Sequence, residues 1–405
     1  MEKIILHCDL NNFFASAALT RNPTLKRLPV AVCGDSEKRH GIILAKNNIA
    51  KGFGVKTAET IWEAKRKCPD LIMLKPDYDL YEEFSLKARK IYLDFSDKVE
   101  PFGIDECWVD VSNLGVDFKK GEEIANIIRK RIKSELSLTV SVGVSFTKTF
   151  AKLGSDIKKP DAVTVISREN FKEIVWPLSA GELLMVGSST KKALRSMGIF
   201  TIGDIANADQ KALEKKLGKN GVSLQNNAKG EDNTPVISVN ERPKPKSISH
   251  SATAEKDLTN IQEVYTAFLE FSENISAKLK EEGLLTKAIG IQATTNDFVS
   301  KQFQVPLDFP TDMAKIILET AVRLFSESLT FEKPFRAVGV RAINLIDKKT
   351  PATQLSLFET TEDIKQKLIE DNVIIIRNKF GKDAIKRAST IQNKAKSSSP
   401  GFYKR

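Results

Sequence analysis

Three acidic residues stand where apolar segments typical of β-strands end. Asp9 directly follows the segment KIILHC (3–8), and Asp105 and Glu106 lie together between VEPFGI and CWVDV. We expect a turn between two paired strands at that point, and neighbouring acids there repel each other unless a cation lies between them. Carboxylate oxygens are ligands for Mg²⁺, which also keeps water and takes oxygens from substrate phosphates. Two such ions about 4 Å apart could activate a 3′-hydroxyl and stabilise a leaving pyrophosphate.

The same acids have structural interpretations. An Asp at a strand end is more often a helix N-cap, and Asn11 or Asn12 could share that role. Spacing alone leaves the metal site and the structural interpretation equally open. Asp110 lies in the following strand, where a structural role is expected. The three histidines, His7, His40 and His250, are too scattered to predict a histidine metal site or a histidine general base.

The elements that must position these acids alternate between strands and helices over the first 165 residues. Apolar runs predict strands at 3–8, 28–33, 41–45, 71–75, 138–145 and 162–166, with a strand pair within 98–112. Helical spacing falls between them, at 12–19, 58–67, 78–95, 121–135 and 147–157. This alternation predicts a mixed α/β unit whose sheet carries site residues at its strand ends.

The pattern changes after residue 168. Short amphipathic helices are expected up to about 235, and ERPKPKS (241–247) is typical of a linker because its prolines disfavour helix and its lysines stay solvated. A second, α+β unit follows. Its predicted strands are 288–294, 301–307 and 336–346, and its predicted helices are 260–282 and 311–327. After this unit we expect a helix at 361–388 and then a disordered Lys/Ser-rich tail.

Composition narrows the kind of protein. The 405 residues suit about two to four compact units. The formal net charge of +11 favours a polyanionic partner, although many basic proteins bind no nucleic acid. The four cysteines form no C-x-x-C pair, which indicates free thiols in a reducing compartment. Neither a signal peptide nor an apolar run of about 18 residues is present, so we expect a cytoplasmic protein without membrane contact.

Three segments resemble the active-site signatures of Y-family DNA polymerases, and most of all those of the DNA polymerase IV (DinB) branch. They are HCDLNNFFASA (7–17), FGIDECWVDVS (102–112) and SVGVSFTKTFAKLGSDIKKPDAVTVI (141–166). The resemblance extends over most of residues 1–347. It implies a template-directed polymerase that adds dNTPs to a primer 3′ end with low fidelity and tolerates damaged templates.

The resemblance also implies the architecture and the cofactor. We expect a right-hand polymerase with α/β and α+β domains, acting as a monomer on primer-template DNA with two Mg²⁺ ions, for which Mn²⁺ could substitute. The expected domains are the palm (1–11 and 75–166), fingers (12–74), thumb (167–235), linker (236–244), little finger (245–347) and C-terminal tail (348–405).

Site residues carry over from the family by position. The metal-binding carboxylates match Asp9, Asp105 and Glu106, with the backbone carbonyl of Leu10 as a further ligand. Phe14 falls where the family places its steric gate, an aromatic ring that leaves no room for the 2′-hydroxyl of a ribonucleotide. Phe13 and Phe14 could also both be core residues of a helix; we interpret Phe13 as core and Phe14 as the gate.

Three further positions resemble triphosphate contacts. Lys159 takes the place of the family's phosphate-binding lysine, with Pro160 ending the preceding helix, although the pair Lys158–Lys159 could equally be a solvated face. The family more often has a tyrosine where Asn48 stands and an arginine where Lys51 stands. Lys51 can donate to a phosphate only as a point charge, so the geometry of this part of the site is expected to differ.

Two regions resemble DNA-binding elements. Residues 183–199 resemble a helix–hairpin–helix, whose turn would point backbone N–H groups at a DNA phosphate, with Gly187 and Lys191 as participants; 217–232 looks like a weaker copy. Such patterns are common in proteins that bind no DNA. In the little finger, the candidate phosphate contacts are Lys246, Arg336 and Arg341, each of which could be ordinary surface charge. His250 is expected to be structural or a weak DNA contact.

The segment QLSLF (354–358) resembles the peptide by which bacterial polymerases bind the sliding clamp (beta subunit). Leu355, Leu357 and Phe358 would enter an apolar pocket, and Gln354 would hydrogen-bond at its rim. A chance match, or a short strand packed on its own domain, would also give this pattern. We favour clamp binding because the segment follows the last domain and precedes a polar tail.

Two other functions remain open at this stage. One is a catalytically silent protein that binds DNA or the clamp, against which the intact Asp9, Asp105 and Glu106 argue. The other is a polymerase of the related mutagenesis-subunit type, active only with an accessory protein. The unusual Asn48 and Lys51 lean toward that second type.

Overall fold

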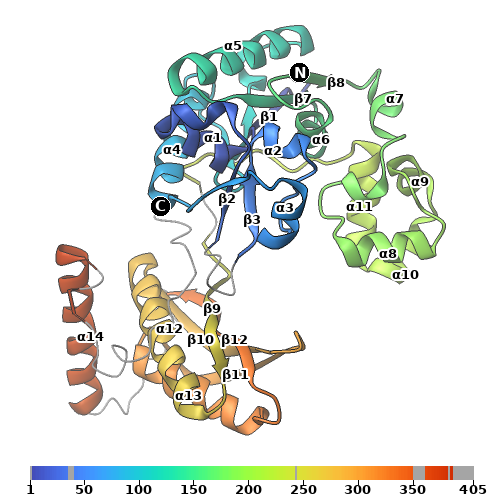
Figure 1. Ribbon diagram of the computed structural model, residues 1–405. Helices are drawn as coiled ribbons and strands as arrows, with labels where there is room; N and C mark the ends of the chain where they lie inside the picture. The colour runs from blue at the N-terminus through green and yellow to red at the C-terminus, as the bar shows by residue number, and fades with distance from the viewer. Residues whose placement is uncertain (1, 35–40, 242–243, 350–360, 382–383, 386–405) are drawn as a thin grey trace. The chain divides into compact units, whose positions relative to one another are not determined.

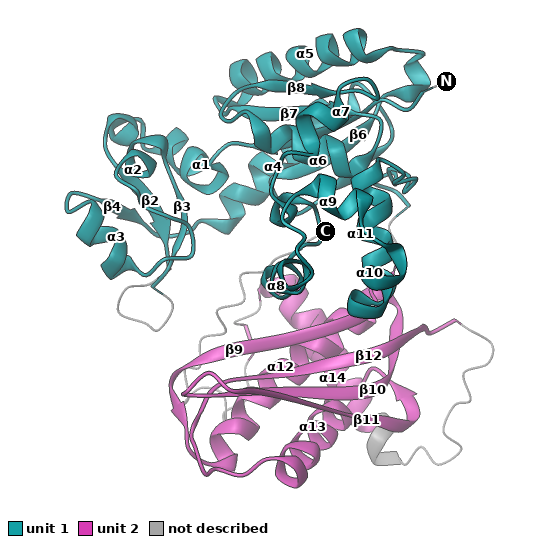
Figure 2. Ribbon diagram, turned by 90° about the vertical axis from the view of Figure 1, so that its right-hand side faces the viewer, with its two compact units in different colours: residues 1–242 teal, residues 243–405 magenta. Residues whose placement is uncertain are grey.

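A computed structural model describes residues 2–34, 41–241, 244–349, 361–381 and 384–385. The chain divides into two compact units, residues 1–242 and 243–405 (Figure 2). The boundary between them falls inside 236–244, the segment expected to be a linker. All three acids predicted to do chemistry lie in the first unit.

The strand that carries Asp9 lies at the centre of a five-stranded sheet (Figure 1). The strand order is β5-β6-β1-β7-β8, with β1 antiparallel to both neighbours and β8 parallel to β7. The strands are β1 (Ile5–Leu10), β5 (Val99–Pro101), β6 (Glu106–Asp110), β7 (Val140–Ser145) and β8 (Val163–Ile166). Apolar side chains of one face pack on α4 (Tyr78–Leu93) and α5 (Phe118–Leu136).

The other face of this sheet is covered by α6 (Lys148–Ile157), which comes unusually close to β7. A Cβ atom added at Gly143 would lie 1.9 Å from the carbonyl oxygen of Ala151 and 2.5 Å from the backbone nitrogen of Ser155. Only glycine therefore allows the helix backbone to rest on the strand. Gly143 pairs with His7, and Asp9 lies two residues along the same face, so α6 presents its side chains to the acids.

A smaller sheet with the order β3-β2-β4 lies between β1 and α4 in the sequence. Its strands are β2 (Val30–Cys33), β3 (Ile43–Lys46) and β4 (Ile72–Leu74), and the helices around it are α1 (Phe13–Arg21), α2 (Asn48–Gly52) and α3 (Ile61–Lys67). The 3₁₀ helices of the first unit are Pro23–Arg27, Ser112–Leu114 and Ala180–Glu182. The sequence analysis did not predict α2, a single turn whose N-terminus is capped by the side chain of Asn47.

The rest of the first unit is helical, as predicted. It contains α7 (Phe171–Val175), α8 (Ser188–Ser196), α9 (Ile202–Asn207), α10 (Gln210–Leu217) and α11 (Lys219–Lys229). The predicted helix before Gly187 is absent from this described stretch: only the 3₁₀ turn Ala180–Glu182 precedes α8. Met185 has φ +72, a left-handed conformation that a continuing helix cannot contain. The second hairpin is present, with Gly218 (φ +64) joining α10 to α11.

The second unit is a four-stranded antiparallel sheet with the order β11-β10-β12-β9. Its strands are β9 (Ser247–Leu258), β10 (Leu284–Thr295), β11 (Ser300–Thr311) and β12 (Phe335–Asp347). Two helices, α12 (Ile261–Glu282) and α13 (Ala314–Ser328), cover one face and enclose an apolar core, as Figure 2 shows.

Two expectations about the ends of these units need correction. Val236, in the expected linker, is buried against Ile5, Trp108 and Ala151, so the linker begins as a packed segment. The helix expected at 361–388 is α14 (Thr361–Phe380), which ends before Gly381, a residue with φ +93. Glu370 of α14 accepts hydrogen bonds from the backbone of Ala314 and Lys315 at the start of α13.

Candidate active site

Asp9 and Glu106 lie directly opposite each other on the antiparallel strands β1 and β6. The N–H of Leu10 donates to the carbonyl of Asp105 at 3.1 Å, and that of Val111 donates to the carbonyl of Ile4 at 3.0 Å. Hydrogen-bonded pairs alternate along such a ladder, so Asp9 and Glu106 form a pair without mutual bonds, with Cα atoms about 4.5 Å apart. Strand register therefore holds these two carboxylates together.

Asp105 joins the pair at the turn that precedes β6. The three acids line one cavity of about 260 Å³, together with Leu10, Asn12, Phe13, Phe14, Leu44, Ala45, Lys46 and Thr57. The N-cap interpretation of Asp9 is wrong, because Asp9 lies within β1. The N-cap residue of α1 is Asn12, three residues later. The side chain of Asn12 does not cap the helix either.

The crowding of the acids changes their protonation. Burial, then the charges of Asp9 and Glu106, raises the pKa of Asp105 to about 7. Burial also acts to raise the pKa of Glu106, but a hydrogen bond from His7 and the ammonium of Lys152 outweigh it and lower the pKa to about 2. A cation placed among these carboxylates would offset the cost of burying the Asp105 charge and its repulsion by Asp9 and Glu106.

Two ammonium groups lie against the acids. Lys152 Nζ is 2.8 Å from Glu106 Oε2 and 3.3 Å from Asp9 Oδ2. Lys159 Nζ is 2.6 Å from Asp9 Oδ2 and 2.9 Å from Asp156 Oδ1. The sequence analysis singled out Lys159 but missed Lys152. The available signal was the glycine in β7, which allows α6 to bring Lys152 onto the acids.

His7 supports Glu106 from inside the sheet. It is fully buried, with Nε2 3.1 Å from Glu106 Oε2 and Nδ1 2.9 Å from Ser155 Oγ. Its ring lies edge-on to Trp108, with the ring centroids 5.2 Å apart. Burial lowers the pKa of His7, so a neutral ring places Nε2 beside the Glu106 carboxylate. This supporting role was not predicted.

The donor set suits a hard divalent cation, although the side chains do not stand in a coordinating arrangement. Within the described ranges, no three His, Cys, Asp or Glu side chains are grouped so as to hold a metal ion. Asp9 and Glu106 instead contact the ammonium groups of Lys152 and Lys159. Three carboxylates, one with its pKa raised to about 7 by burial and then by the charges of the other two, are nevertheless a ligand set that Mg²⁺ or Mn²⁺ would satisfy.

This electrostatic coupling predicts that binding of a divalent cation such as Mg²⁺ among the acids would depend on pH. The pKa of Asp105 in the folded protein is about 7, above its ordinary value of 3.8. The contribution of protonated Asp105 to the free energy of unfolding is therefore complete below pH 3.8 and is lost as pH rises through 7. Mg²⁺ competes with the proton, and we expect its affinity to fall by up to about tenfold per pH unit below 7. Melting temperatures with and without Mg²⁺ should therefore diverge more at pH 8 than at pH 6. Asp105→Asn should remove this difference, and an equal Mg²⁺ effect at both pH values in the parent protein would contradict the coupling.

Phe13 and Phe14 occupy different environments. Phe13 also lines the cavity, but its side chain is buried in the core of the large sheet. Phe14 lines the cavity and stacks on Tyr81, with ring centroids 4.2 Å apart and an interplanar angle of 7°. Stacking fixes the Phe14 ring at the edge of the cavity, which is the geometry that a steric gate needs.

The predicted triphosphate contacts of α2 lie outside this cavity. Asn48 accepts a hydrogen bond from Asn12 Nδ2 at 2.9 Å, and Lys51 is exposed. Neither residue lines the cavity, whereas Lys46 does and donates to Thr57 Oγ1 at 2.8 Å. Burial, then the charge of Lys51, lowers the pKa of Lys46. Lys46 is therefore a cation near the cavity that sequence reasoning missed.

The helical candidates for DNA contact lie at the start of α8. Gly187 is the N-cap residue of α8, with an ordinary φ of −78°, and its carbonyl accepts from the backbone N–H of Lys191 at 2.9 Å. The Lys191 side chain lies over Gly181, where an added Cβ would be 2.8 Å from Nζ. Within the described residues, no side chain caps the start of α8, and the expected preceding helix is absent there.

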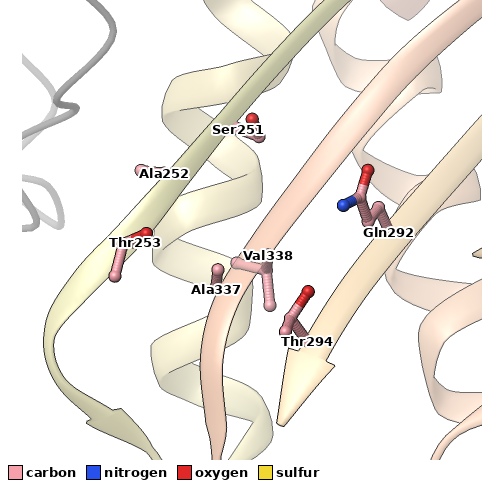
Figure 3. A pocket seen from close by; sticks show the side chains of 7 residues that line it. All are labelled: Ser251, Ala252, Thr253, Gln292, Thr294, Ala337 and Val338. Atoms are coloured by element: carbon pink, nitrogen blue, oxygen red, sulfur yellow. The ribbon is translucent and has the colours of Figure 1, made fainter. Parts of the chain in front are cut away.

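The candidates in the second unit lie on or beside its sheet. A cavity of about 300 Å³ lies on this sheet, and Figure 3 shows its lining residues on β9, β10 and β12: Ser251, Ala252, Thr253, Gln292, Thr294, Ala337 and Val338. Arg341 pairs with Gly290 and donates to Gln302 Oε1 at 3.3 Å. The Arg336 guanidinium lies 5.0 Å from the centroid of the Phe298 ring, and Lys246 is exposed just before β9.

Two expectations concern the chain beyond these sites. The segment Gln354–Phe358 lies outside the described residues, so its predicted contacts stay a prediction. Across the part of the chain that the structure describes, no helix combines the length and the apolar composition needed to span a bilayer.

Comparisons with known proteins show which family the chain resembles. The sequence model of the impB/mucB/samB family matches residues 8–156, and that of the family's C-terminal domain matches 245–357. The chain is 45% identical over 397 residues to DNA polymerase IV of Acetivibrio thermocellus, covering 97% of this chain and 99% of that protein. It is 33% identical to DNA polymerase IV 1 of Bacillus subtilis (strain 168), covering 96% and 94%.

Among solved structures, a Y-family DNA polymerase chimera of Dbh and Dpo4 matches with a TM-score of 0.76 and 25% identity, covering 85% of this chain and 99% of that chain. An insertion ternary complex of Dbh DNA polymerase matches with a TM-score of 0.60 and 24% identity over the same shares, which supports the fold.

Proposed function

The chain belongs to the impB/mucB/samB family of Y-family DNA polymerases, and from this premise we propose that it extends primers past damaged template positions in DNA repair or damage tolerance. It is a DNA-directed DNA polymerase. One observation carries the proposal: strand register holds Asp9 opposite Glu106, with Asp105 beside them, on the wall of a cavity.

We assign the five-stranded sheet and its helices to the palm (1–11 and 75–166) and the three-stranded sheet to the fingers (12–74). The helices from α7 to α11 form the thumb (167–235), and the second unit contains the little finger (245–347) followed by a tail (348–405). The strand order around β1 and the four-stranded sheet of the second unit support this assignment.

Two Mg²⁺ ions would be held by Asp9, Asp105 and Glu106 together with the backbone carbonyl of Leu10. When bound, such ions would activate the primer 3′-hydroxyl and stabilise the departing pyrophosphate. The residues of the chain prepare this site. His7 orients Glu106 through Nε2, and Lys152 offsets the negative charge between Asp9 and Glu106. This arrangement lets carboxylates stay close together before a substrate arrives.

Lys159 is proposed to bind the triphosphate. Its ammonium already lies at the edge of the acids, on Asp9 and Asp156, with the side chain about one-third exposed. An entering phosphate oxygen can replace a carboxylate as its partner at little cost, because one charge-assisted hydrogen bond is exchanged for another. Asn48 and Lys51 would reach only the outer phosphates, since neither lines the cavity.

DNA would be held by groups that contact the backbone rather than the bases. We propose phosphate contacts at the start of α8 (Gly187 and Lys191) and along the second unit's sheet, from Lys246, Arg336 and Arg341. A net charge of +11 supports such contacts. We also propose that the protein acts as a monomer and that Gln354, Leu355, Leu357 and Phe358 bind a sliding clamp.

Two alternatives are a polymerase that needs an accessory protein and a catalytically silent protein that binds DNA or the clamp. The relatives named DNA polymerase IV favour activity by the single chain. Primer extension by the purified chain tests this: nucleotide addition without any other protein supports the proposal, and its absence would contradict it.

A further inference from the structure

Asn11 follows β1 directly and has both ends of its side-chain amide engaged. It is buried, and its backbone N–H continues the β1–β7 ladder by donating to the carbonyl of Thr139 at 2.8 Å. Its Nδ2 donates to Ser141 Oγ, and its Oδ1 accepts from the backbone N–H of Asp161, both at 2.9 Å. Ser141 is the residue of β7 opposite Asp9. The amide of Asn11 thus connects the end of β1 and the strand β7 to a loop about 150 positions later in the chain.

That loop carries Lys159 and is fixed from a second side. Asp161 has φ +54, a left-handed conformation that is unfavourable for a residue other than glycine, so neighbouring groups must hold it. Arg129 of α5 donates to the carbonyl of Asp161 at 2.5 Å and to its Oδ1 at 3.1 Å, and Lys133 Nζ is 3.2 Å from Oδ2. Backbone and side chain of Asp161 are therefore both engaged.

We propose that Asn11 and Arg129 are positioning residues that act through Asp161 to hold Lys159 at the triphosphate site. Asp161 is two residues after Lys159. Its contacts therefore fix the path of the chain after the end of α6, where Lys159 lies. With the loop in place, Lys159 Nζ lies 2.6 Å from Asp9 Oδ2. The inference rests on the proposed triphosphate role of Lys159.

The decisive experiment is a double-variant cycle on the full-length protein, read out as KM and kcat for single-dNTP addition. Asn11→Leu keeps the shape of the side chain and removes both hydrogen bonds. We expect its KM for dNTP to rise about tenfold with kcat within about threefold, because a displaced cation weakens substrate binding more than chemistry. In a Lys159→Met background the same change should alter KM less than about twofold.

Two further variants separate positioning from damage to the fold. Asn11→Asp can still accept from the Asp161 N–H, and the Ser141 hydroxyl can turn to donate to it, so its KM should stay close to that of the parent protein. Arg129→Met removes the contacts on the other side of Asp161, and Arg129 is partly exposed. This variant should raise KM as Asn11→Leu does, and it tests the positioning role even if Asn11→Leu folds poorly. Lys158→Met, at the exposed neighbouring lysine, is the matched control for Lys159→Met.

The outcomes distinguish this inference from the proposed function. If Lys159→Met raises KM while Asn11→Leu and Arg129→Met leave it unchanged, the positioning role is overturned and the Lys159 contact stands. An equal rise caused by Asn11→Leu in both backgrounds would show a general structural effect and overturn it as well. If Lys159→Met leaves KM unchanged, the triphosphate contact fails and this inference fails with it, whereas the polymerase activity is judged by extension itself.

Discussion

Asp105→Asn is expected to lower kcat for nucleotide addition by about 10³-fold, while the affinity for primer-template DNA changes by less than about threefold. Asparagine keeps the shape of the side chain and removes the charge that would hold a metal ion, and transition-state stabilisation of several kcal/mol is lost with it. Single-turnover incorporation with saturating DNA measures the chemical step.

Asp110→Asn is the matched control for this variant. Asp110 is at the other end of β6, and its Oδ1 accepts from the backbone N–H of Ser112 at 3.0 Å, a structural contact away from the cavity. Its kcat should stay within about fivefold of the parent value, since surface-proximal polar contacts contribute modestly. Comparable losses in both variants would show that the effect is structural, and near-normal kcat in Asp105→Asn would contradict the metal-binding role.

Phe14→Val is expected to raise the preference for ribonucleotides, measured as the ratio of kcat/KM for CTP to that for dCTP, by about 10²-fold. The ring stacks on Tyr81 and therefore cannot turn aside for a 2′-hydroxyl. Truncation makes room for the hydroxyl, and pocket contacts of this size give discrimination of about 10- to 200-fold.

Phe13→Leu provides the comparison, because Phe13 neighbours Phe14 on the cavity wall but its side chain is buried in the core. It should lower the melting temperature and leave the CTP-to-dCTP ratio unchanged. A ratio that is the same in Phe14→Val and the parent protein would rule out the steric gate.

Sequence patterns predicted most of the strands and helices of the first unit. The strand predicted at 138–145 is observed as Val140–Ser145, and the helix predicted at 147–157 as Lys148–Ile157. These segments are predictable because apolar runs and helical spacing reflect burial on a sheet face or helix stripe. The false helix before Gly187 had the same spacing, but the left-handed Met185 interrupts it, and no residue type there signals that conformation.

The acids of the site were recognisable from residue type, whereas the groups that surround them depend on contacts between distant segments. Lys152 reaches Glu106 only because Gly143 allows α6 to rest on β7. His7 faces Glu106 only because β1 and β6 pair in one register. Neither the register nor the close approach is local in the sequence, so these partners could not be predicted from spacing.

The two lysines near α2 show a different limit of prediction from the sequence. Lys51 stands at the position that the family resemblance assigns to phosphate binding, yet Lys46 is the lysine that lines the cavity. Both residues are basic and five positions apart, and only the direction of the short helix α2 after β3 separates them. The role predicted for Lys51 stays a prediction, and the structure adds Lys46 as a lysine whose side chain lines the cavity.

The central claim, a polymerase that works as a single chain, is tested most directly by primer extension. The purified protein, with Mg²⁺, four dNTPs and no other protein, is given one undamaged template and one carrying an abasic site, beside the Asp105→Asn variant. We predict extension of the undamaged template and nucleotide addition opposite and beyond the abasic site by the parent protein, and neither by the variant. No extension by the parent protein on either template would contradict the account.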